Sequence, residues 1–199
     1  GLYRTLPNQF EIREINTMKP VFVIFVLMLL TGCAGGWVKV DDAGRTYKGE
    51  HYSSKLPTGW MRIESGDGLV VSRDGILLQY ISILYKPHKN AFETIEKDSS
   101  ADMLPSELAE LTIAEIKAAE DEGLPSLEIL SNAPVELAGR TGFGLHIRYK
   151  TTDGLRMEML LRGIVDENGF YLVKYSAPTL HYFDRDRQAY EDVVASLQL

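Results

Sequence analysis

Cysteine and histidine are scarce in this 199-residue sequence. It contains one cysteine, Cys33, so neither an intrachain disulfide nor a cluster of thiolate metal ligands can form. Its four histidines, His51, His88, His146 and His181, lie far apart, and no two of them have the spacing of a metal-ligand pair. We therefore expect no metal site and no cofactor.

The sequence also lacks the short motifs of the common enzyme chemistries. It has no Gly-x-Ser-x-Gly elbow, no His-Glu-x-x-His pair and no phosphate-binding Gly-Lys-Ser/Thr loop. We expect a protein that works by binding, as an accessory module for a partner protein. Two alternatives stay open, a carrier of a small apolar or anionic ligand and an enzyme whose site is assembled from scattered residues.

Basic residues are outnumbered by acidic ones, 21 to 28, which gives a net charge of −7. Without residues 1–32 the counts become 18 basic (21 less Arg4, Arg13 and Lys19) and 26 acidic (28 less Glu11 and Glu14), a net charge of −8. Nucleic-acid binding needs clustered lysine and arginine, so we expect no nucleic-acid partner. For the same reason we expect no general electrostatic attraction to anionic lipid.

No apolar run is long enough to cross a bilayer as a helix. The longest, Val21 to Leu30, has ten residues, about half of the roughly 20 that a spanning helix requires. It follows Met18-Lys19-Pro20, and the small residue Gly32 precedes Cys33. A basic start, a short apolar stretch and a small-residue cleavage site are typical of a secretory signal. The pattern predicts a signal peptide over residues 18–32.

The end of that segment, Leu30-Thr31-Gly32-Cys33, resembles the lipobox of bacterial lipoproteins. The resemblance implies transfer of diacylglycerol to the Cys33 thiol, cleavage before Cys33 and acylation of the new amine. The mature protein would then be held by its N-terminal lipid on a membrane of the cell envelope. Ala34 after the cysteine resembles the sorting pattern for the outer membrane, so the expected location is its periplasmic leaflet.

The signal divides the chain into segments. Residues 1–17 contain both acidic and basic side chains and fit no signal, which indicates a start site placed too early or a non-native extension. Residues 33–50 are polar and predict a tether that reaches about 55 Å when extended. Residues 51–199 predict one globular α/β (α+β) domain. Trp37 and Val38 interrupt the polar tether, either as an anchor in the membrane interface or as residues that pack on the domain.

The first half of that domain predicts strands and then helices. Residues 69–72 and 76–84 flank Arg73-Asp74-Gly75, a strong signal for a hairpin. Asn90 and Glu93 have the spacing of a capping box for a short helix. Pro105 opens a longer helix to Glu122, which Gly123 ends. Trp60 follows a Pro-Gly turn and is expected in the core.

The second half predicts an antiparallel meander and a final helix. Short strands are expected at 127–130 and 134–137, and longer ones at 142–150, 155–165 and 170–177. The final helix, from Asp184 as its N-cap to Ser196, carries an apolar stripe that would dock it on the sheet: Tyr190, Val193, Val194 and Leu197.

These elements carry a second resemblance. Leu56-Pro57-Thr58-Gly59-Trp60, the meander and the ending from Tyr182 to Leu197 resemble the PsbP/Mog1-like group of sandwich folds. More narrowly, Arg73-Asp74-Gly75 with Leu78-Gln79, and Met103 to Leu108, are similar to uncharacterised proteobacterial lipoproteins. The resemblance implies an antiparallel sheet with helices packed on it. It supports an interaction module only weakly, because one fold hosts many functions.

One face of the meander is the candidate site. Side chains alternate along a strand, so His146 and Arg148 share a face, as do Arg156, Glu158 and Arg162 on the next strand. If the two strands pair in that register, these five residues, with Lys174 as a further candidate, form a basic face for an anionic ligand or a partner. The alternative is a solvated face with cross-strand ion pairs such as Arg148 to Glu158.

Overall fold

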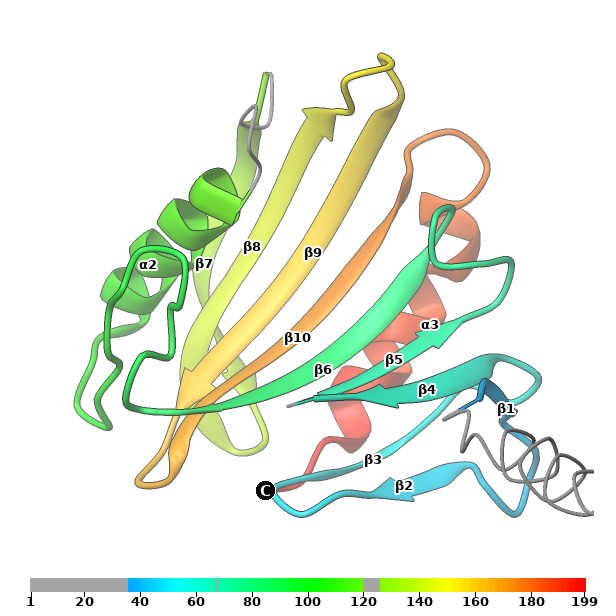
Figure 1. Ribbon diagram of the computed structural model, residues 1–199, viewed down its shortest axis with the longest axis horizontal. Helices are drawn as coiled ribbons and strands as arrows, with labels where there is room; N and C mark the ends of the chain where they lie inside the picture. Colours follow the sequence, from blue (N-terminus) through cyan, green and yellow to red (C-terminus); the bar gives the residue numbers. More distant parts are fainter. Residues whose placement is uncertain (1–35, 67, 120–125) are drawn as a thin grey trace, which may run out of the picture. The chain divides into compact units, whose positions relative to one another are not determined.

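An eight-stranded antiparallel sheet organises the protein (Figure 1). The computed structural model describes residues 36–199 except 67 and 120–125. The sheet order is β1-β4-β5-β6-β10-β9-β8-β7. Its strands, in that order, are Val38–Lys39, Met61–Ser65, Gly68–Ser72, Tyr80–Pro87, Gly169–Pro178, Arg156–Val165, Arg140–Lys150 and Glu128–Leu137. A separate hairpin pairs β2 (Thr46–Lys48) with β3 (Ser53–Lys55).

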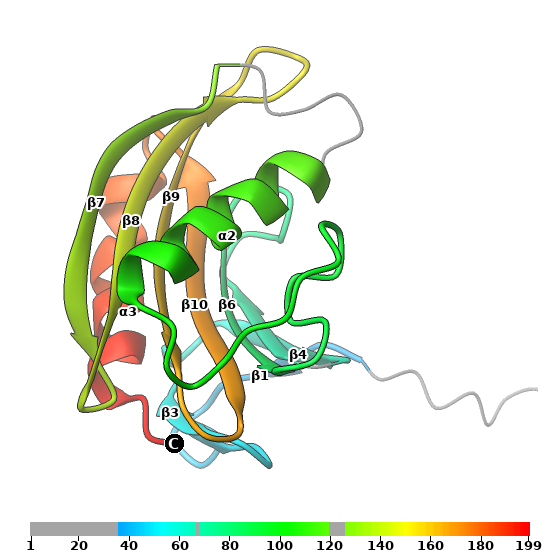
Figure 2. The same ribbon diagram turned by 90° about the vertical axis from the view of Figure 1, so that its left-hand side faces the viewer.

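Two helices cover opposite faces of this sheet (Figure 2). α2 (Pro105–Ala119) packs on β7, β8 and β9, where Leu108, Phe143 and Leu161 belong to one apolar core. α3 (Phe183–Ser196) packs on β10 and β3, where Tyr190 and Val193 belong to a second core. The apolar stripe predicted for the last helix is buried throughout. Burying each helix stripe on its own face explains the layered arrangement.

The predicted hairpin at Asp74-Gly75 is confirmed, since β5 and β6 pair directly. Gly75 has a φ of 111°, a conformation in which a side chain would be strained. The second strand, however, begins at Tyr80 instead of residue 76. Amides of Leu78 and Gln79 both donate to the Gly75 carbonyl, which closes a longer turn and leaves Ile76 and Leu77 exposed.

The meander of β7 to β10 is also confirmed, with one correction at its edge. Residues 127–130 and 134–137 do not form two strands but one continuous strand, β7, with a bulge between Ile129 and Ser131. Pro134 is accommodated because β7 is at the edge of the sheet, where only the N–H groups that point toward β8 form ladder hydrogen bonds.

The short helix predicted after Asn90 is wrong. Asn90 has a φ of 57°, and Phe92 and Lys97 instead form a β-bridge that closes a tight loop. Glu93 does not cap a helix but pairs with Lys86, 2.8 Å away. Phe92 is buried against Phe170 beneath α2, so tertiary packing overrides the local capping signal.

The predicted tether is wrong for residues 36–50, because they belong to the folded unit that runs from Gly36 to Leu199. β1 pairs with β4, and Val40 is fully buried. The Val40 amide donates to the Trp60 carbonyl at 2.7 Å, and the Val40 carbonyl accepts from Gly59 at 2.7 Å. Trp60 itself lies in the core, as predicted.

The helix ends differ slightly from the prediction. α3 starts at Phe183 with Tyr182 as its N-cap, so Asp184 lies in the first turn and is not the cap. α2 is described to Ala119, and the predicted end at Gly123 lies outside the described residues. Over the described part of the chain, no helix has the length and apolar character to span a membrane.

Candidate functional site

The structure brings together three of the five predicted site residues. His146 on β8 and Glu158 on β9 are joined by a 2.5 Å contact between Nε2 and Oε2. The Arg148 guanidinium donates to the other oxygen of Glu158, with its Nη2 3.2 Å away. The His146 ring also stacks on Phe183 of α3, with 5.4 Å between ring centroids. This face is therefore ion-paired, as the alternative interpretation predicted, but it is not fully solvated, because α3 covers part of it.

The other predicted members do not join that cluster. Arg156 is exposed and has no ion pair among the described residues. Arg162 lies four residues beyond Glu158, about 13 Å along the strand, and pairs with Glu191 of α3 at 2.8 Å. Lys174 lies on the opposite face of the sheet from the one predicted. Its partner in the ladder is Leu161, which faces α2, and its ammonium lies 5.1 Å from the Tyr80 ring centroid.

A narrow groove lies between α3 and strands β7 to β9. We call it the α3 groove; its volume is about 170 Å³, and its polar lining includes Ser131, His146, Arg162, Arg187, Tyr190 and Glu191. Arg187 is exposed and has no ion pair within the described ranges. The hydroxyl of Tyr190 is buried and has no hydrogen-bond partner there. Two guanidinium groups and an unsatisfied hydroxyl thus border one small space.

The charges around the α3 groove act on Tyr190 in opposite directions. Burial raises the pKa of its hydroxyl, and the Glu191 carboxylate raises it further, whereas Arg162 and Arg187 lower it. The hydroxyl is therefore a neutral donor at physiological pH. Since Tyr190 also packs between Tyr175 and the Arg162 guanidinium, its position in the groove is fixed.

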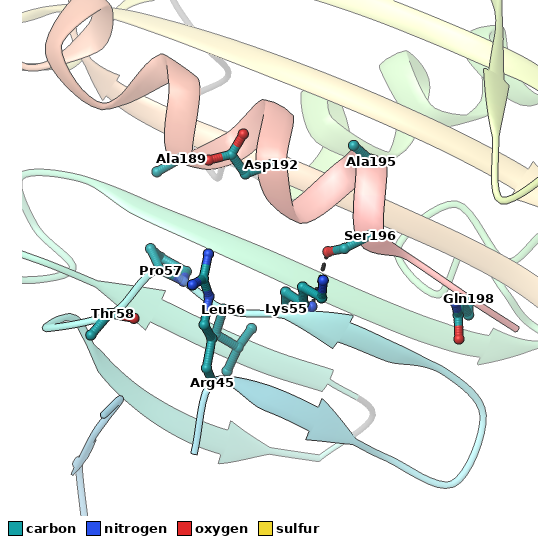
Figure 3. Close-up of a pocket in the computed structure, with 10 residues that line it drawn as sticks. All are labelled: Arg45, Lys55, Leu56, Pro57, Thr58, Ala189, Asp192, Ala195, Ser196 and Gln198. Atoms are coloured by element: carbon teal, nitrogen blue, oxygen red, sulfur yellow. Dashed lines mark hydrogen bonds between the residues drawn. The ribbon is translucent and has the colours of Figure 1, made fainter. Parts of the chain in front are cut away.

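A larger groove separates α3 from the β2–β3 hairpin (Figure 3). Its volume is about 880 Å³. Arg45 and Lys55 line the hairpin side, and Asp192 projects from α3 on the other side. The Lys55 amide donates to Ser196 Oγ at 2.9 Å, which fixes the hairpin to the last turn of the helix. This groove is open and polar, and both basic and acidic side chains line it.

A third polar cluster surrounds Asp186, which is 3% exposed in the first turns of α3. Its carboxylate accepts from Arg73 Nη1 at 3.1 Å, from Gln79 Nε2 at 3.4 Å and from Arg185. Arg185 also pairs with Asp74. The cluster fastens the β5–β6 turn to α3. Its members come from the motifs that carried the family resemblance, but no local pattern indicates that they meet.

Replacing Asp186 with asparagine is expected to lower the free energy of unfolding by about 1.5 to 3 kcal/mol, because hydrogen bonds to a charged group are lost in a buried position. Arg73 and Arg185 remain partly exposed to water, which limits the loss. Asp184→Asn is the matched control, since Asp184 is exposed in the same helical turn. Urea unfolding measures both, and equal effects of the two variants would show that the cluster adds no stability.

The remaining predictions about the site concern metals and the anchor. Across residues 36–199, with 67 and 120–125 left out, no group of three acidic, histidine or cysteine side chains could hold a metal ion. Cys33, the predicted lipidation site, lies outside the described residues.

Comparison with known proteins identifies the fold. No protein-family model and no curated protein sequence matches this chain. The solution structure of cyanobacterial PsbP (CyanoP) from Synechocystis sp. PCC 6803 is similar, with a TM-score of 0.55 and 15% identity. The match covers 77% of this chain and 91% of that protein. The chain therefore has a PsbP-like fold, as predicted, and at this identity the likeness concerns the fold alone.

Two further solved structures are more distant. A protein of Bacteroides thetaiotaomicron VPI-5482 matches with a TM-score of 0.47 and 14% identity, over 74% of this chain and 44% of its own. LpqN, involved in cell envelope biogenesis of Mycobacterium tuberculosis, matches with a TM-score of 0.39 and 12% identity, over 84% of this chain and 86% of its own. Neither is close enough to support an argument about function. The narrower resemblance to proteobacterial lipoproteins stays a prediction.

Proposed function

We propose that this chain is a lipoprotein of the bacterial cell envelope whose domain acts by binding. The observation that supports lipid anchoring is the sequence Leu30-Thr31-Gly32-Cys33 at the end of a ten-residue apolar run. The position that a lipobox modifies is occupied by the only cysteine of the sequence. In this proposal the lipid holds the protein on the periplasmic side of the outer membrane. The domain binds a partner there and has no catalytic role.

The α3 groove supports binding of an anionic group. Within the described residues Arg187 offers an unpaired guanidinium, and Arg162 uses one of its nitrogens for Glu191, which leaves other donors of both forks available. A guanidinium fork matches the two oxygens of a carboxylate or a phosphate. A volume of about 170 Å³ suits one such group and not a whole metabolite. We propose an acidic side chain of an envelope protein as the occupant.

Charge reversal at Arg187 tests this assignment. We expect Arg187→Glu to weaken capture of the partner by the lipidated protein from native membranes at least tenfold. Replacing attraction by repulsion at a desolvated charge contact costs roughly 2 kcal/mol or more, and a factor of ten corresponds to about 1.4 kcal/mol. Arg187 is exposed, so the melting temperature should stay unchanged. Capture is measured by quantitative mass spectrometry after crosslinking.

Arg156→Glu is the matched control, because Arg156 is also exposed and is not part of the groove lining. It should capture the partner as well as the unmodified protein does. Equal capture by all three proteins would refute the groove as the binding site. Absence of any stoichiometric partner for the unmodified protein would contradict the binding role itself.

The larger groove of Figure 3 favours a second candidate function, a carrier of a small anionic ligand. Arg45 and Lys55 line it without an ion pair in the described part of the chain, and its volume of about 880 Å³ is within the usual range of ligand pockets. A carrier would copurify with its ligand from native membranes, which native mass spectrometry detects. A ligand-free protein that binds a protein partner favours the first proposal.

A further inference from the structure

The folded unit starts very close to the cysteine that the proposed function lipidates. β1 begins at Val38, five residues after Cys33. Whatever the conformation of the intervening residues, an extended chain covers at most about 3.6 Å per residue, so Cys33 and Val38 lie within about 18 Å of each other. The predicted tether had about three times that reach. A lipid on Cys33 therefore holds the β1 edge of the sheet near the membrane surface.

The residues next to the anchor are apolar and exposed. Trp37 is 40% exposed and Val38 is 51% exposed, although both are large hydrophobic side chains. Among the strands that the structure describes, β1 lies at the edge of the sheet and pairs only with β4, so none of them covers its outer side. Tryptophan is enriched at the boundary between lipid and water, where its ring is buried and its N–H stays hydrated. The position and the chemistry of Trp37 both fit that boundary.

The charge of the chain segment that contains β1 also permits close approach to a membrane. Between residues 36 and 60, four basic side chains stand against three acidic ones: Lys39, Arg45, Lys48 and Lys55, against Asp41, Asp42 and Glu50. The excess of acid lies elsewhere, since residues 93–128 contain eleven acidic residues and two lysines. That region includes α2, which covers the other face of the sheet from α3. The segment that contains β1 therefore does not contribute to the acidic excess that anionic lipid would repel.

We propose that Trp37 and Val38 insert into the interfacial layer of the membrane that holds Cys33, so that the β1 edge of the sheet faces the bilayer. The occupant of this apolar edge is a phospholipid surface. The inference rests on the proposed lipid anchor and adds an orientation to it. With two contacts in place of one, the domain lies against the membrane instead of moving freely on a tether.

The chain offers a direct probe, because it contains two tryptophans and the other, Trp60, is only 6% exposed. The mature lipidated protein is reconstituted into phosphatidylcholine vesicles with or without brominated acyl chains, which quench tryptophan at short range. We expect the emission of Trp37, taken as the difference between the unmodified protein and Trp37→Phe, to fall roughly twofold or more in brominated vesicles. The Trp60 emission that remains in Trp37→Phe should not change.

Flotation of the same vesicles separates the two hypotheses. Protein that floats with the vesicles while Trp37 stays unquenched overturns the proposed orientation and leaves the lipid anchor standing. Protein that does not float overturns the anchor, and the orientation fails with it. Quenching of Trp37 in floating protein supports both. Trp37→Phe keeps an aromatic ring at an exposed position, so the variant should fold like the unmodified protein.

Discussion

Replacing Cys33 with serine is expected to release the protein from the membrane or to leave an unprocessed precursor. A serine hydroxyl cannot take the place of the thiol in diacylglyceryl transfer, and the sequence has no second cysteine. Each buried CH₂ of an acyl chain contributes about 0.8 kcal/mol, so two or more chains anchor stably where a single chain does not. Fractionation of cells into membrane and soluble pools, followed by immunoblotting, measures the effect.

Ala34→Ser is the control for the loss of anchoring, because it changes a small residue next to the cysteine and keeps the thiol. It should remain in the membrane pool. A Cys33→Ser protein of mature size that still sediments with membranes would contradict lipid anchoring. Sedimentation of the unmodified protein with inner-membrane vesicles would refute only the assignment to the outer membrane.

Truncating Trp60 to alanine is expected to lower the free energy of unfolding by about 3 to 5 kcal/mol. The side chain is 6% exposed in the core to which α3 also contributes, and the Trp60 carbonyl accepts the Val40 amide. The cavity therefore weakens both the core and the attachment of the N-terminal strand. At about 2 to 4 °C per kcal/mol for a domain of this size, the melting temperature should fall by about 10 °C.

Trp37→Ala is the matched control for stability, since it removes the same side chain from an exposed position. In protein without lipid it should change the melting temperature little. Thermal unfolding followed by circular dichroism compares the two variants. If Trp60→Ala melts like the unmodified protein but loses partner capture, Trp60 is a functional aromatic residue and its structural role is refuted.

The sequence predicted the parts of the fold that local signals determine. Asp74-Gly75 marks a hairpin whose two strands are adjacent in the chain, so the pairing needs no distant information. The stripe on α3 has helical spacing and an apolar face that only the sheet could bury. The α/β class follows from these elements, whereas the PsbP-like arrangement was implied by the family resemblance and is shown by the comparison with CyanoP.

The errors in the predicted fold have a common physical cause: the structure of these segments depends on partners that are distant in the sequence. β1 has two residues and is stable because β4, more than twenty residues later, pairs with it. The segment around Asn90 has a capping signal, but burial of Phe92 under α2 selects a loop. Neither partner can be identified from a window of a few residues.

The sequence predicted the meeting of those candidate site residues whose positions follow from the alternation of side chains along two adjacent strands. His146, Arg148 and Glu158 meet because β8 and β9 are joined by a short turn that sets their register. To predict the face of Lys174, the register of the next hairpin would have to be known. A register shift of one residue moves a side chain to the opposite face of the sheet. Arg187 lies on α3, and its place beside Arg162 depends on how the helix docks. The only sequence signal was its spacing of four residues from Glu191.

The central claim is that Cys33 is the lipidated N-terminus of the mature protein. Intact-mass and peptide mass spectrometry of protein purified from native membranes tests it most directly. The account predicts an N-terminal peptide that begins at Cys33 and carries a thioether-linked diacylglycerol and an acylated amine. An unmodified Cys33 within a chain that still begins at Gly1 or Met18 would contradict it.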